Sequence, residues 1–165
     1  MALKINIHDI RDVKSAQQQD TLVVEAKELD LPELPDISWR PLSFTYEMTN
    51  AGNLFVLLGK LQGSVAMECS RCLKPVAYPL ELEVAEQFSR HPQGDDIHIF
   101  FGEEIDVAQV LRDDILLSLP AKPLCFPDCL GLCPHCGIDL NQESCQCNPQ
   151  HVDPRLAVLE KLIRK

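Results

Sequence analysis

The eight cysteines are the residues whose type and spacing point most directly to chemistry. Six of them fall in one short run, CFPDCLGLCPHCGIDLNQESCQC, at residues 125–147, and the other two form the turn CSRC at 69–72. Thiolate sulfur is a preferred ligand of structural Zn²⁺, and a C-x-x-C pair supplies two tetrahedral ligands from one tight turn. The spacing therefore indicates metal sites built from cysteine.

The cysteines divide by spacing into two sets of four, which we call the first and the second quartet. In CPHCG, Pro134 sets the turn and Gly137 suits the left-handed conformation that points backbone amides at the thiolates. The predicted ligands are Cys69, Cys72, Cys125 and Cys129 in the first quartet, and Cys133, Cys136, Cys145 and Cys147 in the second. We expect about two Zn²⁺ per chain, although four thiolates also suit iron. A competing partition joins the two C-x-x-C pairs, as in a zinc ribbon.

Other uses of the cysteines are disulfide formation and thiol redox chemistry. The N-terminus MALKINIHDIRD has no apolar core typical of a signal peptide, so we expect a cytoplasmic location, where disulfides are rare. A redox thiol is typically activated at a helix N-terminus, whereas LKPVAYPLELEV after Cys72 is typical of a turn and a strand. A catalytic zinc needs an open coordination position. We therefore expect closed structural sites and no enzymatic activity, with His135 as a solvated loop residue.

Charge and motifs narrow the choice of partners. The chain has 15 basic and 25 acidic residues and a formal net charge of −10, which thiolate sites would make more negative. Phosphate backbones are repelled by such a field, so we expect direct RNA binding to be weak or absent. The longest apolar stretch, NLFVLLG, is far short of the roughly 20 residues of a membrane span. No nucleotide-binding or hydrolase motif appears, so no small-molecule substrate is expected.

Alternating hydrophobic residues predict that the first 100 residues are mostly strands of an antiparallel sheet with one solvated face. The turn signals NAGN at 50–53 and CSRC at 69–72 separate three such strands. Two prolines in ELDLPELPDIS, residues 28–38, predict a loop along the sheet edge rather than a central strand. The predicted inward residues are Leu42, Phe44, Tyr46 and Met48; Phe55, Leu57, Leu61, Val65 and Met67; and Val76, Tyr78, Leu80, Leu82 and Val84.

Two helices are predicted after the strands. IDVAQVLRDDILLSLP carries an apolar stripe at helical spacing, with Asp106 and Gln109 as a capping box and Pro120 as the stop. DPRLAVLEKLIRK, residues 153–165, predicts a C-terminal helix with Asp153 as its cap. The predicted fold is thus α+β, with a core domain at 1–124 made of a mostly antiparallel sheet and one packed helix. A cysteine-rich zinc-binding segment with the C-terminal helix follows at 125–165.

These motifs together resemble one family. CSRCL after a strand, ILLSLP ending a helix, the pattern C-x3-C-L-G-L-C-P-x-C-G-x-x-L-N with C-x-C, and the closing DPRLAVLEKL resemble the bacterial YceD family, the large ribosomal RNA subunit accumulation proteins. The resemblance covers about residues 40–163, and the role of the first 40 residues stays open. It implies a part in the accumulation of large-subunit ribosomal RNA and in ribosome biogenesis. It also implies the two-quartet partition, because some relatives lack only the last cysteine cluster.

A protein partner follows from the implied function and the charge. An acidic chain that takes part in ribosome assembly is expected to bind a basic ribosomal protein or an assembly factor, because such a partner offers the complementary field. A zinc-dependent adaptor for protein interactions, unrelated to ribosomes, is the alternative function. A thiol redox protein is the third.

Overall fold

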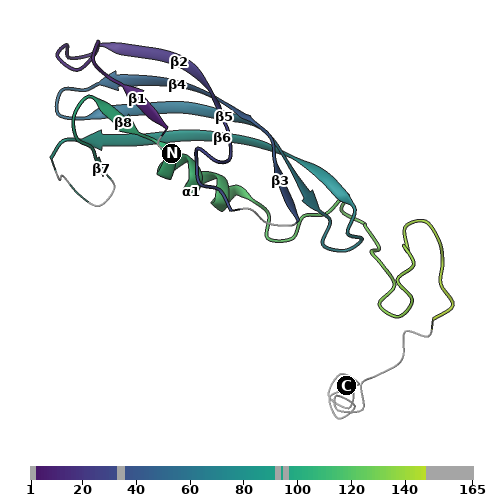
Figure 1. The fold of residues 1–165 in the computed structure, drawn as a ribbon. Helices are drawn as coiled ribbons and strands as arrows, with labels where there is room; N and C mark the ends of the chain where they lie inside the picture. The colour runs from purple at the N-terminus through teal and green to yellow at the C-terminus, as the bar shows by residue number, and fades with distance from the viewer. Residues whose placement is uncertain (1–2, 33–35, 92–93, 95–96, 148–165) are drawn as a thin grey trace, which may run out of the picture.

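The computed structural model describes residues 3–32, 36–91, 94 and 97–147. One curved sheet forms the body of this part of the chain, a single helix packs beneath it, and the cysteine-rich segment extends from one end (Figure 1). The elements in chain order are β1 (Lys4–Asn6), β2 (Gln17–Val24), β3 (Ile37–Trp39), β4 (Leu42–Asn50), β5 (Phe55–Glu68), β6 (Pro75–Ser89), β7 (His98–Ile99), β8 (Glu104–Asp106) and α1 (Ala108–Ser118).

The main sheet has the strand order β2-β4-β5-β6-β7, and β3 also pairs with β5. The β5–β6 hairpin is its longest pairing and runs antiparallel from Phe55 opposite Phe88 to Glu68 opposite Pro75. Strand β4 pairs with β5 only between residues 55 and 62, and β3 continues beside β5 at residues 65–67. The far end of the hairpin therefore extends beyond β4 and carries the CSRC turn.

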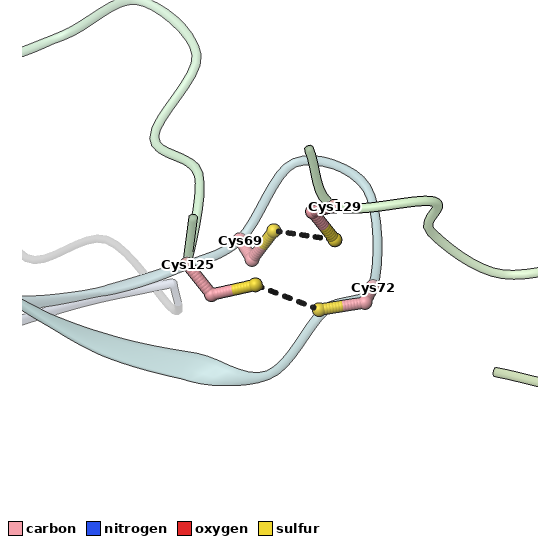
Figure 2. Close-up of side chains that lie close together, drawn as sticks. All are labelled: Cys69, Cys72, Cys125 and Cys129. Carbon is pink, nitrogen blue, oxygen red and sulfur yellow. Dashed lines mark hydrogen bonds between the residues drawn. The ribbon is translucent and has the colours of Figure 1, made fainter. Parts of the chain in front are cut away.

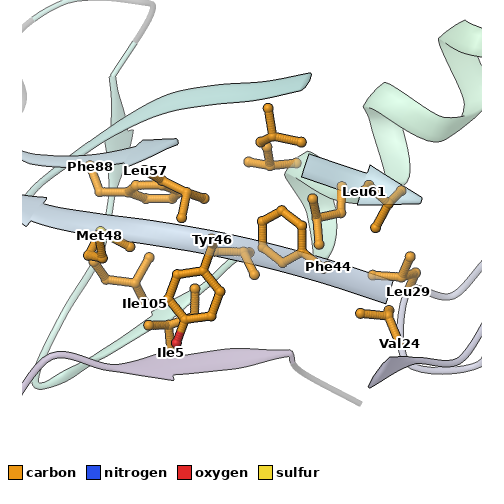
Figure 3. Packing of buried hydrophobic residues seen from close by; sticks show 14 of the residues in the cluster. Ile5, Val24, Leu29, Phe44, Tyr46, Met48, Leu57, Leu61, Phe88 and Ile105 are labelled. Atoms are coloured by element: carbon orange, nitrogen blue, oxygen red, sulfur yellow. The ribbon is translucent and has the colours of Figure 1, made fainter. Parts of the chain in front are cut away.

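The inner face of this sheet holds the hydrophobic core. All predicted inward residues of β4 and β5 are buried, and Leu80 and Val84 of β6 are buried beside the half-buried Val76, Tyr78 and Leu82. Glu81 and Glu83 lie on the opposite, exposed face of β6. Figure 3 shows Phe44, Met48, Leu57 and Leu61 packed in this layer. The prediction of a sheet with one solvated face is confirmed.

Helix α1 and the short β1–β8 ribbon cover the inner face. Val110, Leu111 and Ile115 of α1 are buried in the same hydrophobic cluster as the sheet residues. Ile5 of β1 and Ile105 of β8 are directly paired and join that cluster from the ribbon (Figure 3). The described helix is not long and apolar enough to cross a membrane.

The predicted capping box of α1 forms only in part. The helix begins at Ala108 after the cap position Val107, and Val107 itself makes no side-chain capping hydrogen bond. Asp106 instead ends β8, because its backbone is held extended opposite Lys4, and its carboxylate accepts a hydrogen bond from the Ala108 amide at 3.0 Å. The stop at Pro120 agrees with a helix that ends at Ser118.

Two further predictions concern the proline-rich loop and the C-terminal helix. The loop predicted at 28–38 is wrong at its end, because strand β3 begins at Ile37 and pairs with β5. Strand β3 lies outside the path of the other five strands, which agrees with the predicted absence of a central strand there. The predicted C-terminal helix at 153–165 lies outside the described residues.

Candidate metal centres

The first quartet joins the tip of the β5–β6 hairpin to the segment that follows α1. Cys69 and Cys72 lie in the hairpin turn, and Cys125 and Cys129 lie in the later segment (Figure 2). The Sγ atoms of Cys69 and Cys129 are 3.9 Å apart, and those of Cys72 and Cys125 are 3.6 Å apart. All four sulfurs lie within 4.8 Å of one another. The fold thus brings together thiols that are more than 50 residues apart in sequence.

Backbone hydrogen bonds shape the hairpin turn around Cys69. The Cys69 amide donates to the Lys74 carbonyl at 2.9 Å, and the Leu73 amide donates to the Cys69 carbonyl at 2.9 Å. Leu73 adopts the left-handed conformation, with φ of 58°. We call this turn, residues 69–74, the first knuckle.

The second quartet repeats the arrangement within one short segment. The Sγ atoms of Cys133 and Cys145 are 3.4 Å apart, and the four sulfurs of Cys133, Cys136, Cys145 and Cys147 again lie within 4.8 Å of one another. Cys133 is buried, whereas Cys136 is exposed. This second site is therefore closer to the surface than the first, in which three of the four cysteines are buried.

The turn at 133–138, which we call the second knuckle, has the same hydrogen-bond pattern as the first. The Cys133 amide donates to the Ile138 carbonyl at 2.8 Å, and the Gly137 amide donates to the Cys133 carbonyl at 2.9 Å. Gly137 has φ of 75°, so the predicted left-handed glycine is confirmed. His135 lies exposed in this turn.

The sulfur geometry fits a tetrahedral metal. Four sulfurs about 2.3 Å from a central Zn²⁺ are about 3.8 Å from one another, and the measured separations of 3.4, 3.6 and 3.9 Å are close to that value. Bonded disulfide sulfurs would be only about 2.05 Å apart, and all eight cysteines are free. The sulfurs group as the two predicted quartets and not as the zinc ribbon partition. Both groups could hold a metal ion, and the binding itself stays a prediction.

Backbone amides ionise one thiol in each quartet. Amides of Cys72 and Arg71 lower the pKa of Cys69 to about 6, against the opposing effect of burial. In the second knuckle, the amides of Cys136 and His135 lower the pKa of Cys133 to about 6. Hydrogen bonds to a thiolate favour its charged form, which is the form that binds metals. Each quartet therefore contains one sulfur that the backbone holds ready as a ligand.

Direct contacts tie the later segment to the first knuckle. The Arg71 guanidinium donates to the Cys129 carbonyl at 2.6 Å, and the Leu132 amide donates to the Arg71 carbonyl at 3.0 Å. Gly131 permits this approach: a Cβ there would lie 2.8 Å from the Arg71 carbonyl oxygen, and its φ is 78°. A side chain at position 131 would push the two segments apart.

Sequence reasoning missed two polar residues of this region, Asp139 and Asn141. The Asp139 side chain is only 15% exposed, and its Oδ2 lies 2.6 Å from the Lys74 ammonium. Lys74 and the Asn141 amides lower the pKa of Asp139 to about 2. The Asn141 Nδ2 donates to the Cys129 sulfur at 3.4 Å. The only sequence signal for Asn141 is its place in the pattern G-x-x-L-N, which does not reveal a contact with a cysteine of the other quartet.

Comparison with known proteins gives relatives for most of this chain. An uncharacterized protein of Mycobacterium tuberculosis is 33% identical over 115 residues, which are 66% of this chain and 55% of that protein. The uncharacterized protein YlbN of Bacillus subtilis is 34% identical over 110 residues, or 64% of each chain. This chain therefore spans roughly half to two thirds of the length of these relatives.

Two named relatives match shorter stretches. The large ribosomal RNA subunit accumulation protein YceD of Haemophilus influenzae is 35% identical over 79 residues, 43% of this chain and 45% of that protein. A chloroplastic YCED homolog 1 of Zea mays is 43% identical over 51 residues, 30% of this chain and 17% of that protein. No solved structure gave a significant match. The model of the family described as large ribosomal RNA subunit accumulation protein YceD matches residues 57–163, which include both quartets, and the chain therefore belongs to the YceD family.

Proposed function

We propose that this chain is a non-catalytic zinc-binding factor that supports the accumulation of large-subunit ribosomal RNA in the cytoplasm, and through it ribosome biogenesis. The observation that carries the proposal is the family match over residues 57–163, because the family is described by that role. The matched region contains almost all of the β5–β6 hairpin, α1 and both quartets. The proposed metal centres therefore lie in the part of the chain that matches the family.

The donor set supports a structural role for the metal. Each quartet offers four sulfurs, and four thiolates complete the tetrahedral coordination of Zn²⁺. A metal so held supplies a rigid cross-link rather than an open position for substrate. In the first quartet, the chain's own residues would use that cross-link to hold the segment after α1 against the hairpin tip.

The net charge of the chain favours a protein partner over a nucleic acid. With a net charge of −10, the chain attracts basic surfaces and repels phosphate. We therefore propose that it reaches the assembling subunit through a basic ribosomal protein or an assembly factor.

Depletion of the protein tests the ribosomal role. Loss of the protein should lower the ratio of large-subunit to small-subunit ribosomal RNA, and the wild-type chain should restore it. A chain with Cys69→Ser and Cys72→Ser should fail to restore the ratio, while Gln142→Ala, at an exposed position of the second quartet's loop, serves as the matched control. An unchanged ratio after depletion would refute the ribosomal role.

An adaptor function unrelated to ribosomes is favoured by one observation. Leu73, Phe126 and Leu130 each directly follow a cysteine of the first quartet, and each is 46–67% exposed. Exposed apolar side chains on a rigid cross-link are suited to bind another protein. This alternative predicts an unchanged ribosomal RNA ratio after depletion, together with partners that are lost when the three side chains are truncated.

A thiol redox function has less support. The pKa of Cys69 is lowered as in reactive cysteines, but Cys69 is fully buried against the other ligands. Alkylation of the metal-loaded protein separates the two roles: a structural site is protected, and a redox thiol labels fast.

A further inference from the structure

The side chain of Asn141 connects the two quartets. Asn141 lies in the loop between the two cysteine pairs of the second quartet, yet its Nδ2 donates to the sulfur of Cys129 in the first quartet at 3.4 Å. Its Oδ1 accepts a hydrogen bond from the Leu130 amide at 2.7 Å. One amide side chain from the second site therefore holds both the last ligand of the first site and the residue after it.

Asp139 fixes the position of Asn141. Asp139 Oδ1 accepts hydrogen bonds from the backbone amide of Asn141 at 3.0 Å and from Nδ2 at 2.7 Å. Its other oxygen, Oδ2, is buried and pairs with the ammonium of Lys74 at 2.6 Å. Lys74 belongs to the first knuckle. A continuous chain of contacts therefore runs from Lys74 through Asp139 and Asn141 of the second quartet's loop to Cys129 of the first quartet.

The second quartet's loop has few apolar residues with which to order itself. In residues 138–147, Ile138 and Leu140 are the only large hydrophobic side chains, and both are half-buried. The backbone bond from the Leu140 amide to the Gly131 carbonyl at 2.9 Å is the loop's main-chain link to the segment between the quartets. Such a loop depends on its metal for a fixed conformation.

We propose that the two quartets bind metal cooperatively through Asn141. Metal in the second quartet strengthens metal binding by the first, and metal in the first strengthens metal binding by the second. The inference rests on the proposed zinc binding. Metal in the second quartet orders the loop and presents Nδ2 to Cys129, and a hydrogen bond to a thiolate ligand stabilises its charged form. Coupling of binding free energies is reciprocal, so a metal in the first quartet must favour the second equally.

The size of the effect follows from comparable metal sites. Loss of a hydrogen-bonding group that supports a ligand typically weakens metal binding by about 10–100-fold. We expect the low end, about tenfold, because the first quartet keeps its own backbone amide bonds to Cys69 when Asn141 is absent.

Native mass spectrometry of the full-length, metal-free, reduced protein with one equivalent of zinc gives a first test. With tenfold coupling and otherwise equal quartets, only about a quarter of the chains carry a single zinc, and the rest carry none or two. Independent quartets leave about half or more of the chains with a single zinc. Asn141→Ala should raise the single-zinc fraction toward that value, while Gln142→Ala, a neighbouring amide that is exposed, should leave it unchanged.

A competition titration with a chromophoric chelator gives the second test. Removal of the second site with Cys133→Ser and Cys136→Ser should weaken zinc binding by the first quartet about tenfold. Asn141→Ala should weaken the first quartet by a similar factor, and it should have no further effect when added to the double serine variant. A purely structural defect of Asn141→Ala would still add to the double variant.

The outcomes separate this inference from the proposed function. If the wild-type chain takes up no zinc, zinc binding and coupling both fail. If it takes up two zinc ions but the first quartet binds equally well with and without the second, the coupling alone is overturned. An effect of Asn141→Ala that persists undiminished in the double variant also overturns it.

Discussion

Leu73 and Gly137 occupy the same position in the two knuckles. Each follows the second cysteine of a C-x-x-C pair, each has positive φ (58° and 75°), and each donates its amide at 2.9 Å to the carbonyl of the first cysteine, Cys69 or Cys133. Glycine adopts this conformation without steric cost, and leucine does not. The backbone of the first knuckle is therefore strained at Leu73, whereas the second knuckle has a glycine at the same position and avoids this strain.

Replacement of Leu73 by glycine should stabilise the protein. Removal of the left-handed strain is worth about 1 kcal/mol, and little burial is lost, because the Leu73 side chain is 58% exposed. Urea unfolding at a fixed saturating zinc concentration measures the change in the free energy of unfolding. Leu130→Gly is the matched control, since Leu130 is 67% exposed and is not among the residues with positive φ, so glycine there should only destabilise. Equal losses at both positions would show that Leu73 carries no strain.

Each quartet should hold one metal ion on its own four cysteine ligands. The wild-type protein, purified without added metal, should contain about two ions per chain. Cys69→Ser with Cys72→Ser should remove one ion, and Cys133→Ser with Cys136→Ser should remove the other. Elemental analysis and native mass spectrometry count the ions and identify the metal. A variant with all four serine substitutions should lose both ions. If the two C-x-x-C pairs shared one site, this variant would lose no more metal than either double serine variant.

Chelation should loosen the cysteine-rich segment before the sheet. Residues 130–147 have few buried apolar side chains, whereas β4 and β5 together bury nine hydrophobic side chains. Hydrogen exchange after chelator is added should therefore rise first in 130–147, while the amides of β4 and β5 stay protected. Simultaneous loss of protection in both regions would show that the sheet depends on the metal as well.

Cys69 should titrate below the ordinary thiol range in metal-free protein. Its pKa is lowered to about 6 by amides of its own turn, so it is ionised at neutral pH, and its ionised form adds stability to the fold. That contribution is complete above the ordinary thiol pKa of 9.0 and is lost as pH falls through about 6. Alkylation followed by mass spectrometry across this pH range reports each cysteine separately.

The control for this titration is the same protein in urea. There, Cys69 should label with the same pH midpoint as the other cysteines, near the ordinary value of 9.0. A Cys69 midpoint that does not differ between folded and unfolded protein would contradict the effect of the turn.

The isolated protein should not bind RNA tightly at physiological salt. The chain has a net charge of −10, and charges beyond about 8 Å are screened at 150 mM salt. Arg71 and Lys74 beside the first quartet are already engaged, with the Cys129 carbonyl and with Asp139. Titration of labelled large-subunit RNA fragments with zinc-loaded protein tests the prediction. Submicromolar binding that is lost on charge reversal of Arg71, Lys74, Lys161, Arg164 and Lys165 would refute it.

The central strands and the C-x-x-C pairs were predictable because local signals define them. The alternation in LSFTYEM is read correctly, since β4 buries one face and exposes the other. The C-x-x-C spacing at 69–72 and 133–136 is equally local, because each pair needs only one turn. These features depend on neighbours in sequence.

The parts that could not be predicted depend on partners far away in the chain. Strands β1 and β8 have three residues each and are about 100 residues apart, so neither has a detectable pattern. Their pairing also displaced the predicted helix start, because Asp106 is held in β8. The contact from Asn141 to Cys129 joins two loops without periodicity, and only the folded chain reveals it.

Cys69 and Cys129 are 60 positions apart, so the ligands of the first quartet are synthesised at different times. At about 5–20 residues per second, the first knuckle waits about 3–12 s for its last ligand. The strands β2 to β6 and helix α1 are all made within or before this interval. During it, the knuckle carries only two of its four ligands, so it can hold a metal weakly or pass it on. A fully ligated first quartet is therefore a mark of a chain that has been synthesised through Cys129.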